Sequence, residues 1–345
     1  MQTQQKTRPI QNNPKISVIL PFFNAEDTLK RAIRSITNQT YQDFECILIN
    51  NNSTDNSPSI ASSLAKEDSR IKIIEESEQG IVFASNSGFQ QAKGEFIARM
   101  DADDEALPER LKLQAEFLEK HPEFVAVGGL VEYKSDFHSF RGFKKYVDWV
   151  NSVISYEQIK TNRFIDSPIV NPSAMWRRET GEQHGMYKNG DFPEDYEMWL
   201  RWLEAGVKIS KVPKYVLKWH DSKKRLTRNH SIYSDDAFYQ IKTFYLYRWL
   251  EKNNPFHPHV TIWGASKISR KRAQLLKKYG IIIDAYIDTK NTRQIGKPLY
   301  HYKKIDEAGK YFILVYVRQW YAKEQIKNFL QTRKYKEGEH FLFVS

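Results

Sequence analysis

Short apolar runs alternate with segments of helical periodicity through the first part of this chain. The runs that we expect to be strands cover residues 16–20, 44–49, 71–74, 95–100 and 124–131. The segments that we expect to be helices cover residues 25–38, 57–66 and 81–92. Continuous apolar runs are typical of strands covered on both faces, and strand–helix alternation favours parallel pairing through right-handed crossovers. The pattern therefore predicts an α/β fold with a doubly wound sheet.

Three aspartates, Asp101, Asp103 and Asp104, directly follow the run at 95–100. Like charges this close destabilise a fold unless something neutralises them, and a hard divalent cation with oxygen ligands is the usual partner. The alternative is an acidic loop that caps the helix expected from Pro108, because aspartate is favourable near the start of a helix.

Two further groups of residues, 21–24 and 50–55, also follow predicted strands. Asn24 can in addition cap the helix that follows it. Ligands of open α/β sheets bind outside the carboxyl ends of the strands. The fold would therefore bring both groups and the three aspartates to one crevice, and this convergence favours a metal or phosphate site.

The pattern loosens beyond residue 133. We expect a turn and a short strand at 171–177 and a helix at 191–203, with Asp191 as its N-cap. Glu194 and Asp195 would lie in the first turn of that helix, where acids also simply offset the helix dipole. Edge strands are expected at 207–216.

A long helix rich in aromatic residues is expected at 231–252. We favour the interpretation that it packs on the main domain. The alternative is that the helix lies on a membrane interface, because basic residues surround it in the sequence.

A smaller α/β unit is predicted beyond Pro255 and Pro258. Its expected strands cover 260–263, 281–287 and 312–317, and its expected helices cover 268–279 and 321–331. The sequence GASKIS at 264–269 keeps only the first glycine of the dinucleotide-binding pattern. The other two glycines allow close approach of a pyrophosphate and close helix packing, so their loss argues against ordinary dinucleotide binding and favours a structural or partner-binding role.

The totals exclude several classes of protein. The chain has 345 residues and one cysteine, Cys46, which excludes an internal disulfide and a cysteine-based zinc site. Its start is a polar tail over 1–14 without the apolar core of a signal peptide, and no run of about 18 apolar residues follows. We therefore expect a cytoplasmic protein.

The net charge of +11 is unevenly placed. Residues 1–200 carry 23 Lys and Arg against 30 Asp and Glu, whereas residues 201–345 carry 30 against 12. The basic C-terminal portion favours contact with phosphates, acidic polymers or the inner face of an anionic membrane, as a peripheral contact. The alternative is that the basic side chains simply form a solvated surface. Because no nucleic-acid-binding motif accompanies the charge, no nucleic-acid partner is expected.

Four segments resemble, in order, the family 2 glycosyltransferases with the A-type (GT-A) nucleotide-sugar fold. They are ISVILPFFNAEDTL with its continuation to NNNSTDNS, SEQGIVFASNSGFQQAKGEFIARMDADDEALPERL, NPSAMWRRE, and FPEDYEMWLRW. The resemblance covers about residues 14–230. It implies a GT-A-type mixed sheet, and the C-terminal unit resembles the degenerate Rossmann-like domains appended to some bacterial glycosyltransferases.

The resemblance also implies roles for individual residues. On the donor side, Pro21 and Phe23 would flank the nucleobase and Asp101 would approach the ribose, with Asn24, Asn51 and Asn86 completing that side. Asp103, with Asp101, would hold Mn²⁺ or Mg²⁺ against the diphosphate, and His220 lies where some relatives place a histidine near the metal. Asp195, with Glu194 beside it, would supply the catalytic base.

Two departures from the family pattern stand out. Asn51 replaces an aspartate that normally accepts a hydrogen bond from uracil, and it carries no charge. Ser85 stands where many relatives carry an arginine. Asn51 leaves the nucleotide open, although UDP is the first expectation. Ser85 implies that one positive contact near the phosphates is missing or supplied elsewhere.

We therefore expect an inverting, metal-dependent glycosyltransferase that moves a sugar from a nucleotide-sugar donor to a hydroxyl of a glycan or lipid-linked acceptor in cell-surface polysaccharide synthesis. Its expected domains are a tail (1–14), the GT-A domain (15–230), the aromatic linking helix (231–254) and the Rossmann-like domain (255–345). The alternatives are a catalytically impaired nucleotide-sugar or glycan-binding module and, with less support, a sugar nucleotidyltransferase, for which the sequence lacks a glycine-rich basic loop after the first strand.

Overall fold

The computed structural model describes residues 13–135, 141–222, 225–290 and 296–345. The predicted polar tail lies outside the described residues except for its last two positions. The chain divides into two compact units. The first comprises Met1–Glu132, Asn171–Gly185 and Lys214–His220, and the second comprises Tyr133–Val170, Met186–Pro213 and Asp221–Ser345.

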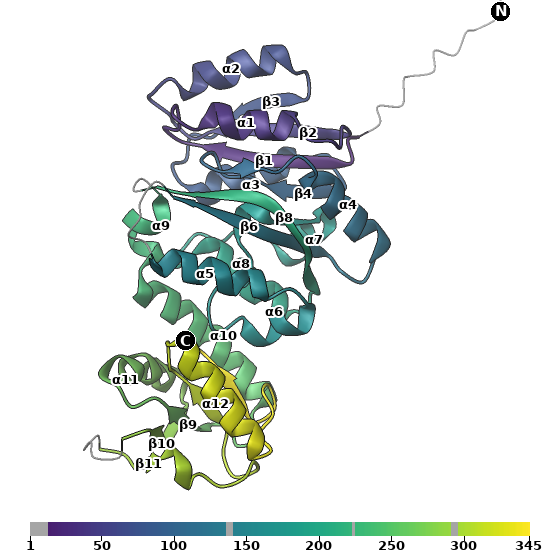
Figure 1. Cartoon of the computed structure of the whole chain (residues 1–345). Coiled ribbons are helices and arrows are strands. Elements are labelled where there is room, and N and C mark those ends of the chain that lie inside the picture. The colour runs from purple at the N-terminus through teal and green to yellow at the C-terminus, as the bar shows by residue number, and fades with distance from the viewer. Residues whose placement is uncertain (1–12, 136–140, 223–224, 291–295) are drawn as a thin grey trace, which may run out of the picture. The chain divides into compact units, whose positions relative to one another are not determined.

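A mixed sheet with the strand order β3-β2-β1-β4-β7-β6-β8-β5 is centred on the first unit, and end residues of β6 and β8 belong to the second unit (Figure 1 labels β1 to β4, β6 and β8). Its strands are β1 Ile16–Phe22, β2 Phe44–Asn50, β3 Ile71–Glu75, β4 Phe96–Arg99, β5 Glu105–Ala106, β6 Ala126–Ser135, β7 Met175–Arg177 and β8 Ile209–Asp221. Strands β1 to β4 pair in parallel, whereas β7 runs antiparallel to β4 and β6. The predicted α/β fold with a doubly wound mixed sheet is confirmed.

The helices of this unit are α1 Leu29–Thr37, α2 Ser57–Glu67, α3 Ile81–Gln91, α4 Arg110–Lys120 and α7 Arg178–His184, with a 3₁₀ turn at Asn171–Ser173. They pack on different strands: α2 on β3, α3 on β1 and β2, and α4 and α7 on β7. Gly88 of α3 shows how close the packing is, since a Cβ atom there would lie 2.7 Å from Ile49 Cδ1 and 2.8 Å from Ile19 Cγ2. Cys46 is buried in β2, and burial raises the pKa of its thiol to about 12, so it belongs to the inert core.

Three predicted helix starts are wrong. Asn24 has a φ of +46° and does not cap α1, whose N-cap is Thr28. Helix α4 begins at Arg110 rather than at Pro108. Asp191 does not cap α8 (Glu194–Glu204), which begins after Pro193, because the residue before a proline is driven out of the helical region.

The C-terminal part of the second unit contains an all-parallel sheet with the order β11-β10-β9-β12-β13. Its strands are β9 His259–Trp263, β10 Ile282–Asp288, β11 Leu299–His301, β12 Ile313–Val315 and β13 Phe341–Phe343. Its helices are α11 Lys267–Gln274 and α12 Trp320–Thr332, with 3₁₀ segments at Leu275–Tyr279 and Tyr302–Lys304. The predicted second α/β region is confirmed, although the sequence did not indicate β11 and β13.

The aromatic helix α10 (Asp235–Asn253) packs inside its own unit. Tyr239, Tyr245 and Leu250 are buried in one hydrophobic cluster with Tyr196 of α8 and Val260 of β9. Burying each such side chain stabilises the fold by roughly 1.5–3 kcal/mol. The packing interpretation of this helix is therefore confirmed.

The remaining helices of the second unit are short. They are α5 Arg141–Ser152, α6 Tyr156–Asn162, α9 Leu226–Asn229 and a 3₁₀ turn at Ser231–Tyr233. No helix among the described residues is long and apolar enough to cross a bilayer.

Candidate active site

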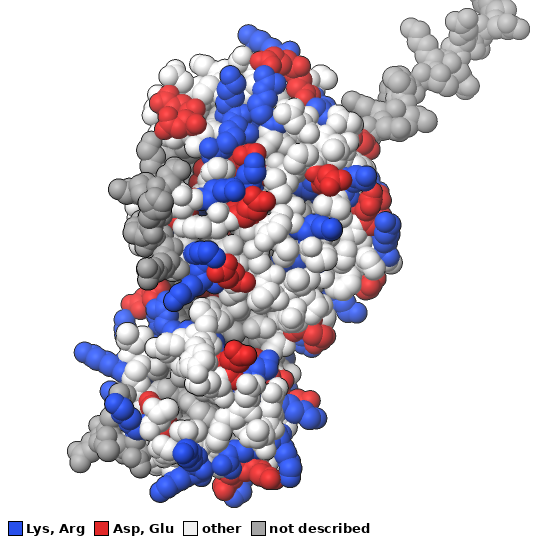
Figure 2. Space-filling view, viewed as in Figure 1, with Lys and Arg blue, Asp and Glu red and all other residues white. Residues whose placement is uncertain are grey.

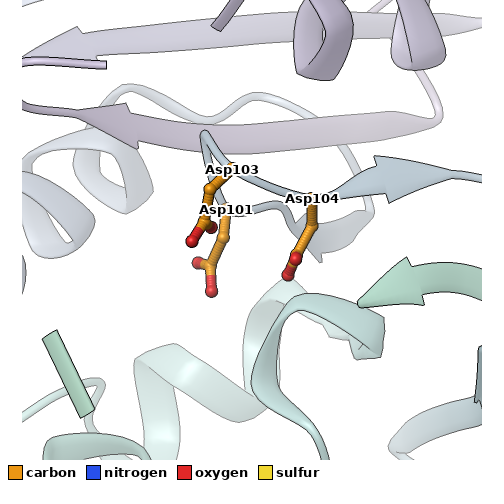
Figure 3. Close-up of side chains that lie close together, drawn as sticks. All are labelled: Asp101, Asp103 and Asp104. Carbon is orange, nitrogen blue, oxygen red and sulfur yellow. The ribbon is translucent and has the colours of Figure 1, made fainter. Parts of the chain in front are cut away.

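The three aspartates lie together in the loop between β4 and β5. One carboxylate oxygen from each of Asp101, Asp103 and Asp104 lies within 4.8 Å of the others (Figure 3). Asp101 and Asp103 are half-buried, whereas Asp104 is fully buried. Figure 3 shows the carboxylates of Asp101 and Asp103 side by side and pointing the same way from this loop. The loop therefore presents a compact group of oxygen ligands at the carboxyl edge of the sheet.

Two buried arginines offset part of this negative charge. Arg99 forms an ion pair of 2.7 Å with Asp101. The Arg110 guanidinium is fully buried and donates hydrogen bonds to the carbonyl oxygens of Arg99 (2.6 Å) and Ala174 (3.2 Å). Burial lowers the pKa of Arg110 to about 10, and the nearby carboxylates of Asp101 and Asp104 oppose that shift.

Sequence analysis did not identify either arginine. Arg99 could have been found because it is the one arginine inside the apolar run at 95–100. A charged side chain is rarely buried without a partner, so this arginine should have a partner of opposite charge. Arg31 of α1 was also missed, and its Nη2 donates a 2.6 Å hydrogen bond to the Asp103 carbonyl oxygen.

His220 lies beside the acidic loop, although it is 116 residues from Asp104 in the sequence. Its backbone N–H donates a 2.8 Å hydrogen bond to Asp104 Oδ1, and its Nε2 lies 3.8 Å from Glu105 Oε2. Burial alone would raise the pKa of Glu105, but the hydrogen bond from Lys218 holds that pKa below its ordinary value. The loop is thus tied to β8 through the His220 backbone, whereas the His220 ring is not one of the ligand atoms grouped within 4.8 Å of one another.

The loops after β1 and β2 are interlocked. Asn24 Oδ1 accepts a hydrogen bond from the Thr54 N–H (2.8 Å), and the Asn24 N–H donates to Ser53 Oγ (3.1 Å). Asp55 accepts hydrogen bonds from the backbone N–H groups of Glu26 (3.0 Å) and Ser57 (2.9 Å). The residues after these two strands therefore converge, as the sequence predicted.

Asn51 is buried and fully engaged with the loop that leads to α3. Its Nδ2 donates to the carbonyl oxygens of Glu76 (2.9 Å) and Glu78 (2.8 Å), while its Oδ1 accepts from Gly80 N (2.8 Å) and Gln79 Nε2 (3.3 Å). The carbonyl oxygen of a side-chain amide has two lone pairs. A nucleobase contact through Asn51 Oδ1 would therefore displace the long contact from Gln79.

The other residues predicted to bind the sugar donor differ in their exposure to solvent. Phe23 is 50% exposed just beyond β1, whereas Pro21 is buried within that strand. Asn86 is half-buried on α3, next to the buried Ser85. An aromatic ring exposed at the carboxyl end of a strand can stack on a nucleobase.

The predicted catalytic residues lie in the second unit, in the first turn of α8. Glu194 is buried, and its Oε2 accepts a 2.7 Å hydrogen bond from the Tyr233 hydroxyl. Asp195 is only half-buried, and its Oδ1 accepts from the Tyr196 N–H (2.7 Å). Burial, together with the negative charges of Asp166 and Asp195, raises the pKa of Tyr146 well above its ordinary value.

The composition of the acidic loop fits a hard divalent cation. Carboxylate oxygens are the ligands that Mg²⁺ and Mn²⁺ prefer, and three of them lie close enough to share one ion. Arg99 occupies one side of Asp101, which leaves Asp103 as the half-buried carboxylate not involved in that ion pair.

The mixed sheet and the acidic loop at its carboxyl edge define a glycosyltransferase with the GT-A fold. The chain belongs to glycosyltransferase family 2: the model "Glycosyl transferase family 2" matches residues 17–184. The putative glycosyltransferase EpsE of Bacillus subtilis is 32% identical over 228 residues, which cover 65% of this chain and 80% of that protein.

Two further comparisons cover different parts of the chain. The GalNAc(5)-diNAcBac-PP-undecaprenol beta-1,3-glucosyltransferase of Campylobacter jejuni is 44% identical over 96 residues, 27% of this chain and 31% of that protein. The crystal structure of S. aureus TarS 1-349 in complex with UDP-GlcNAc superposes with a TM-score of 0.53 at 18% identity, over 77% of this chain and 71% of that chain. At that identity the likeness shows the fold alone.

Proposed function

We propose that this protein is an inverting, metal-dependent glycosyltransferase that transfers a sugar from a nucleotide-sugar donor, with UDP as the first choice of nucleotide, to a hydroxyl of a glycan or lipid-linked acceptor in cell-surface polysaccharide synthesis. The observation that carries the proposal is the group of three carboxylates within 4.8 Å at the carboxyl edge of the parallel strands. The family membership of the chain supports it.

The acidic loop would serve the donor diphosphate. Asp103 with Asp101, and His220 as a further ligand, would hold Mn²⁺ or Mg²⁺, which neutralises the charge that gathers on the diphosphate leaving group. Asp104 would keep the loop in place through its hydrogen bond to the His220 N–H. Asp101 would also approach the ribose of the donor.

The nucleobase would bind over the interlocked loops after β1 and β2. The exposed ring of Phe23 would stack on the base, and Pro21, Asn24, Asn51 and Asn86 would complete the donor side. The Asn51 side chain holds the 76–80 loop through four hydrogen bonds. We therefore assign Asn51 a role in shaping the base pocket as well as in contacting the base.

Asp195 would act as the general base that takes the proton from the acceptor hydroxyl as it attacks the anomeric carbon. The half-buried Asp195 suits this task better than Glu194, whose carboxylate is buried and receives the Tyr233 hydroxyl hydrogen bond. Glu194 would orient the first turn of α8. Attack on the face opposite the leaving group would invert the anomeric centre in one step, without an enzyme nucleophile.

One relative supports the proposed acceptor class. The Campylobacter jejuni relative is named as a glucosyltransferase acting on an undecaprenyl-diphosphate-linked glycan. A lipid-linked glycan is therefore the acceptor to test first.

A screen of nucleotide sugars tests this proposal. UDP-, GDP- and TDP-sugars are incubated with the protein and with Mn²⁺, Mg²⁺ or EDTA, and release of the nucleoside diphosphate is measured. We expect metal-dependent release from one nucleotide class and its loss in Asp103→Asn. Asp43→Asn is the matched control, because Asp43 is exposed and precedes β2 at the opposite end of the parallel strands. Equal release in wild type and Asp103→Asn would refute the proposal.

A further inference from the structure

A cleft of about 650 Å³ lies within the second unit at the carboxyl ends of its parallel strands, of which β9, β10 and β11 are labelled in Figure 1. Gly264 follows β9, Asp288 ends β10 and Val317 lies two residues beyond β12, and all three border the cleft. Its volume lies within the usual range of small-molecule sites, and this edge of a parallel sheet is where such sites form. The sequence analysis had favoured a structural or partner-binding role for this region.

One end of the cleft is aromatic. Trp263, Tyr302 and Phe329 border it and pack on one another, with ring centroids 5.0 to 6.3 Å apart. Trp263 is 4% exposed, whereas Tyr302 and Phe329 are half-buried. Aromatic faces of this kind stack on planar rings such as nucleobases.

The other end is cationic. Arg272 and Arg318 border the cleft and share a single carboxylate, Asp235, at 2.8 Å and 3.5 Å. Two guanidinium groups facing one carboxylate leave net positive charge, and the guanidinium fork matches phosphate geometry. The Arg318 side chain is 62% exposed, so it can turn to a ligand at little cost.

The turn after β9 determines where a phosphate can bind. Gly264 has a φ of +118°, as the first glycine of a nucleotide-binding turn does, but two N–H groups of the turn are already used. The Ala265 N–H donates to Asp288 Oδ2 (2.8 Å), and the Ser269 N–H donates to Ser266 Oγ (3.1 Å). The Asp288 carboxylate therefore repels an anion from the turn and leaves the two arginines as the phosphate site.

A tyrosine hydroxyl adds a polar contact. Tyr316 is 2% exposed and borders the cleft, and among the residues that the structure describes its hydroxyl is not one of the fully buried polar atoms without a partner. A hydroxyl at the border of the cleft can donate a hydrogen bond to a ligand or accept one.

We propose that this cleft is a nucleotide site for a nucleoside monophosphate, with the base on the aromatic end and the phosphate on Arg318 and Arg272. The residues of this site are separate from those assigned to the sugar donor. The used N–H groups of the turn exclude the pyrophosphate placement of an ordinary dinucleotide, while the volume and the two ends fit one base and one phosphate.

Calorimetry on the full chain tests the proposal with AMP, UMP, GMP, adenosine, inorganic phosphate and NAD⁺, all in EDTA. We expect at least one monophosphate to bind saturably, and its nucleoside and inorganic phosphate to bind at least tenfold more weakly. Arg318→Gln should weaken the monophosphate at least tenfold, and Tyr302→Leu several-fold. Lys278→Gln is the matched control, because Lys278 is exposed and precedes β10 at the amino end of the sheet.

Asp103→Asn separates this site from the donor site. The proposal requires monophosphate binding to persist in Asp103→Asn and to fall in Arg318→Gln. Binding that is lost in Asp103→Asn and kept in Arg318→Gln would place the nucleotide elsewhere and overturn the proposal. Absence of binding by all three monophosphates, equal binding of inorganic phosphate, or tighter binding of NAD⁺ than of any monophosphate would overturn it as well.

Discussion

The carboxyl edges of the two parallel strand sets differ in their charged side chains. In the first unit, β4 is followed by three clustered carboxylates whose nearest buried cations are Arg99 and Arg110. In the second unit, β10 ends in one aspartate whose oxygen is taken by the Ala265 N–H, and two arginines border the cleft. The comparison indicates that the same sheet geometry serves different ligands: an edge of carboxylates suits a cation with a diphosphate, and an edge with arginines suits a bare anion.

The second unit also buries lysines against carbonyl groups and rings. Lys211 Nζ donates to the Val150 carbonyl oxygen, Lys242 Nζ donates to the Ile165 carbonyl oxygen (2.7 Å), and Lys323 Nζ lies 3.8 Å from the Trp320 ring centroid. Burial lowers the pKa of Lys211 and of Lys323 to about 7 and that of Lys242 to about 8. Figure 2 shows Lys and Arg side chains spread over the region of α11, α12 and β10, with some Asp and Glu side chains among them.

The largest effect is expected at Asp195. Asp195→Asn should lower the turnover of sugar transfer by about 10³-fold, because it removes the general base, while the affinity for the nucleotide stays within about twofold. Glu194→Gln should cost much less, since its buried side chain can still accept from the Tyr233 hydroxyl. Steady-state kinetics with donor and acceptor measure both. Normal turnover of Asp195→Asn would show that another group takes the proton.

The next largest effect is a loss of stability expected at Arg110, the buried arginine near Asp101 and Asp104. Arg110→Met should lower the free energy of unfolding by about 3 kcal/mol, because it leaves the carbonyl oxygens of Arg99 and Ala174 without their donor and removes a charge that offsets the acids. Urea denaturation measures the loss. Wild-type stability of Arg110→Met would contradict the view that the acidic edge is held by built-in cations.

Because Lys211 is buried, we expect the free energy of unfolding to depend on pH. Lys211 has a folded pKa of about 7, below the unfolded value of about 10.4, so between these values only the unfolded chain keeps the proton and stability rises with pH. From pH 7 to pH 9 the contribution is about 2 kcal/mol. Denaturation at both pH values should show this rise in wild type and in Lys208→Met, whose lysine is exposed, and a smaller rise in Lys211→Met. An unchanged rise in Lys211→Met would remove Lys211 as its source.

The smallest effect is expected in the interlocked loops of the first unit. Burial alone would raise the pKa of Asp55, but hydrogen bonds from Ser57 and Glu26 hold it below its ordinary value. Asp55→Asn should therefore cost about 1 kcal/mol at pH 7. The cost should fade as the pH drops through the range where Asp55 itself takes up a proton. A cost that stays constant from pH 7 to pH 3 would show that the charge of Asp55 plays no part.

The sequence predicted the parts of the fold that depend on periodicity and strand ends. The runs at 16–20 and 44–49 correspond to β1 and β2, and the segment at 25–38 contains α1. The acidic loop was identified because three acids after a buried strand have few structural uses. The predicted caps at Asn24 and Asp191 failed because backbone strain and a following proline outweighed side-chain capping preference.

Features that depend on long-range contacts could not be predicted from the sequence. The tie between Asp104 and the His220 N–H joins residues 116 positions apart, and Arg110 acts through backbone carbonyl groups that no motif marks. The C-terminal cleft was missed for a different reason. The missing glycines argue against a pyrophosphate on the turn, but they say nothing about arginines supplied by other helices and loops.

The central claim is that the loop with Asp101, Asp103 and Asp104 binds a nucleotide only together with a metal ion. Calorimetry of UDP, GDP and TDP binding tests this claim most directly. Titrations with Mn²⁺ and with EDTA are compared for wild type, Asp103→Asn and the control Asp43→Asn. We predict that one nucleoside diphosphate binds with Mn²⁺ in wild type and in Asp43→Asn, and that its affinity falls at least tenfold in EDTA and in Asp103→Asn. Binding of the same affinity without metal and in Asp103→Asn, or no metal-dependent binding of any of the three, would contradict the claim.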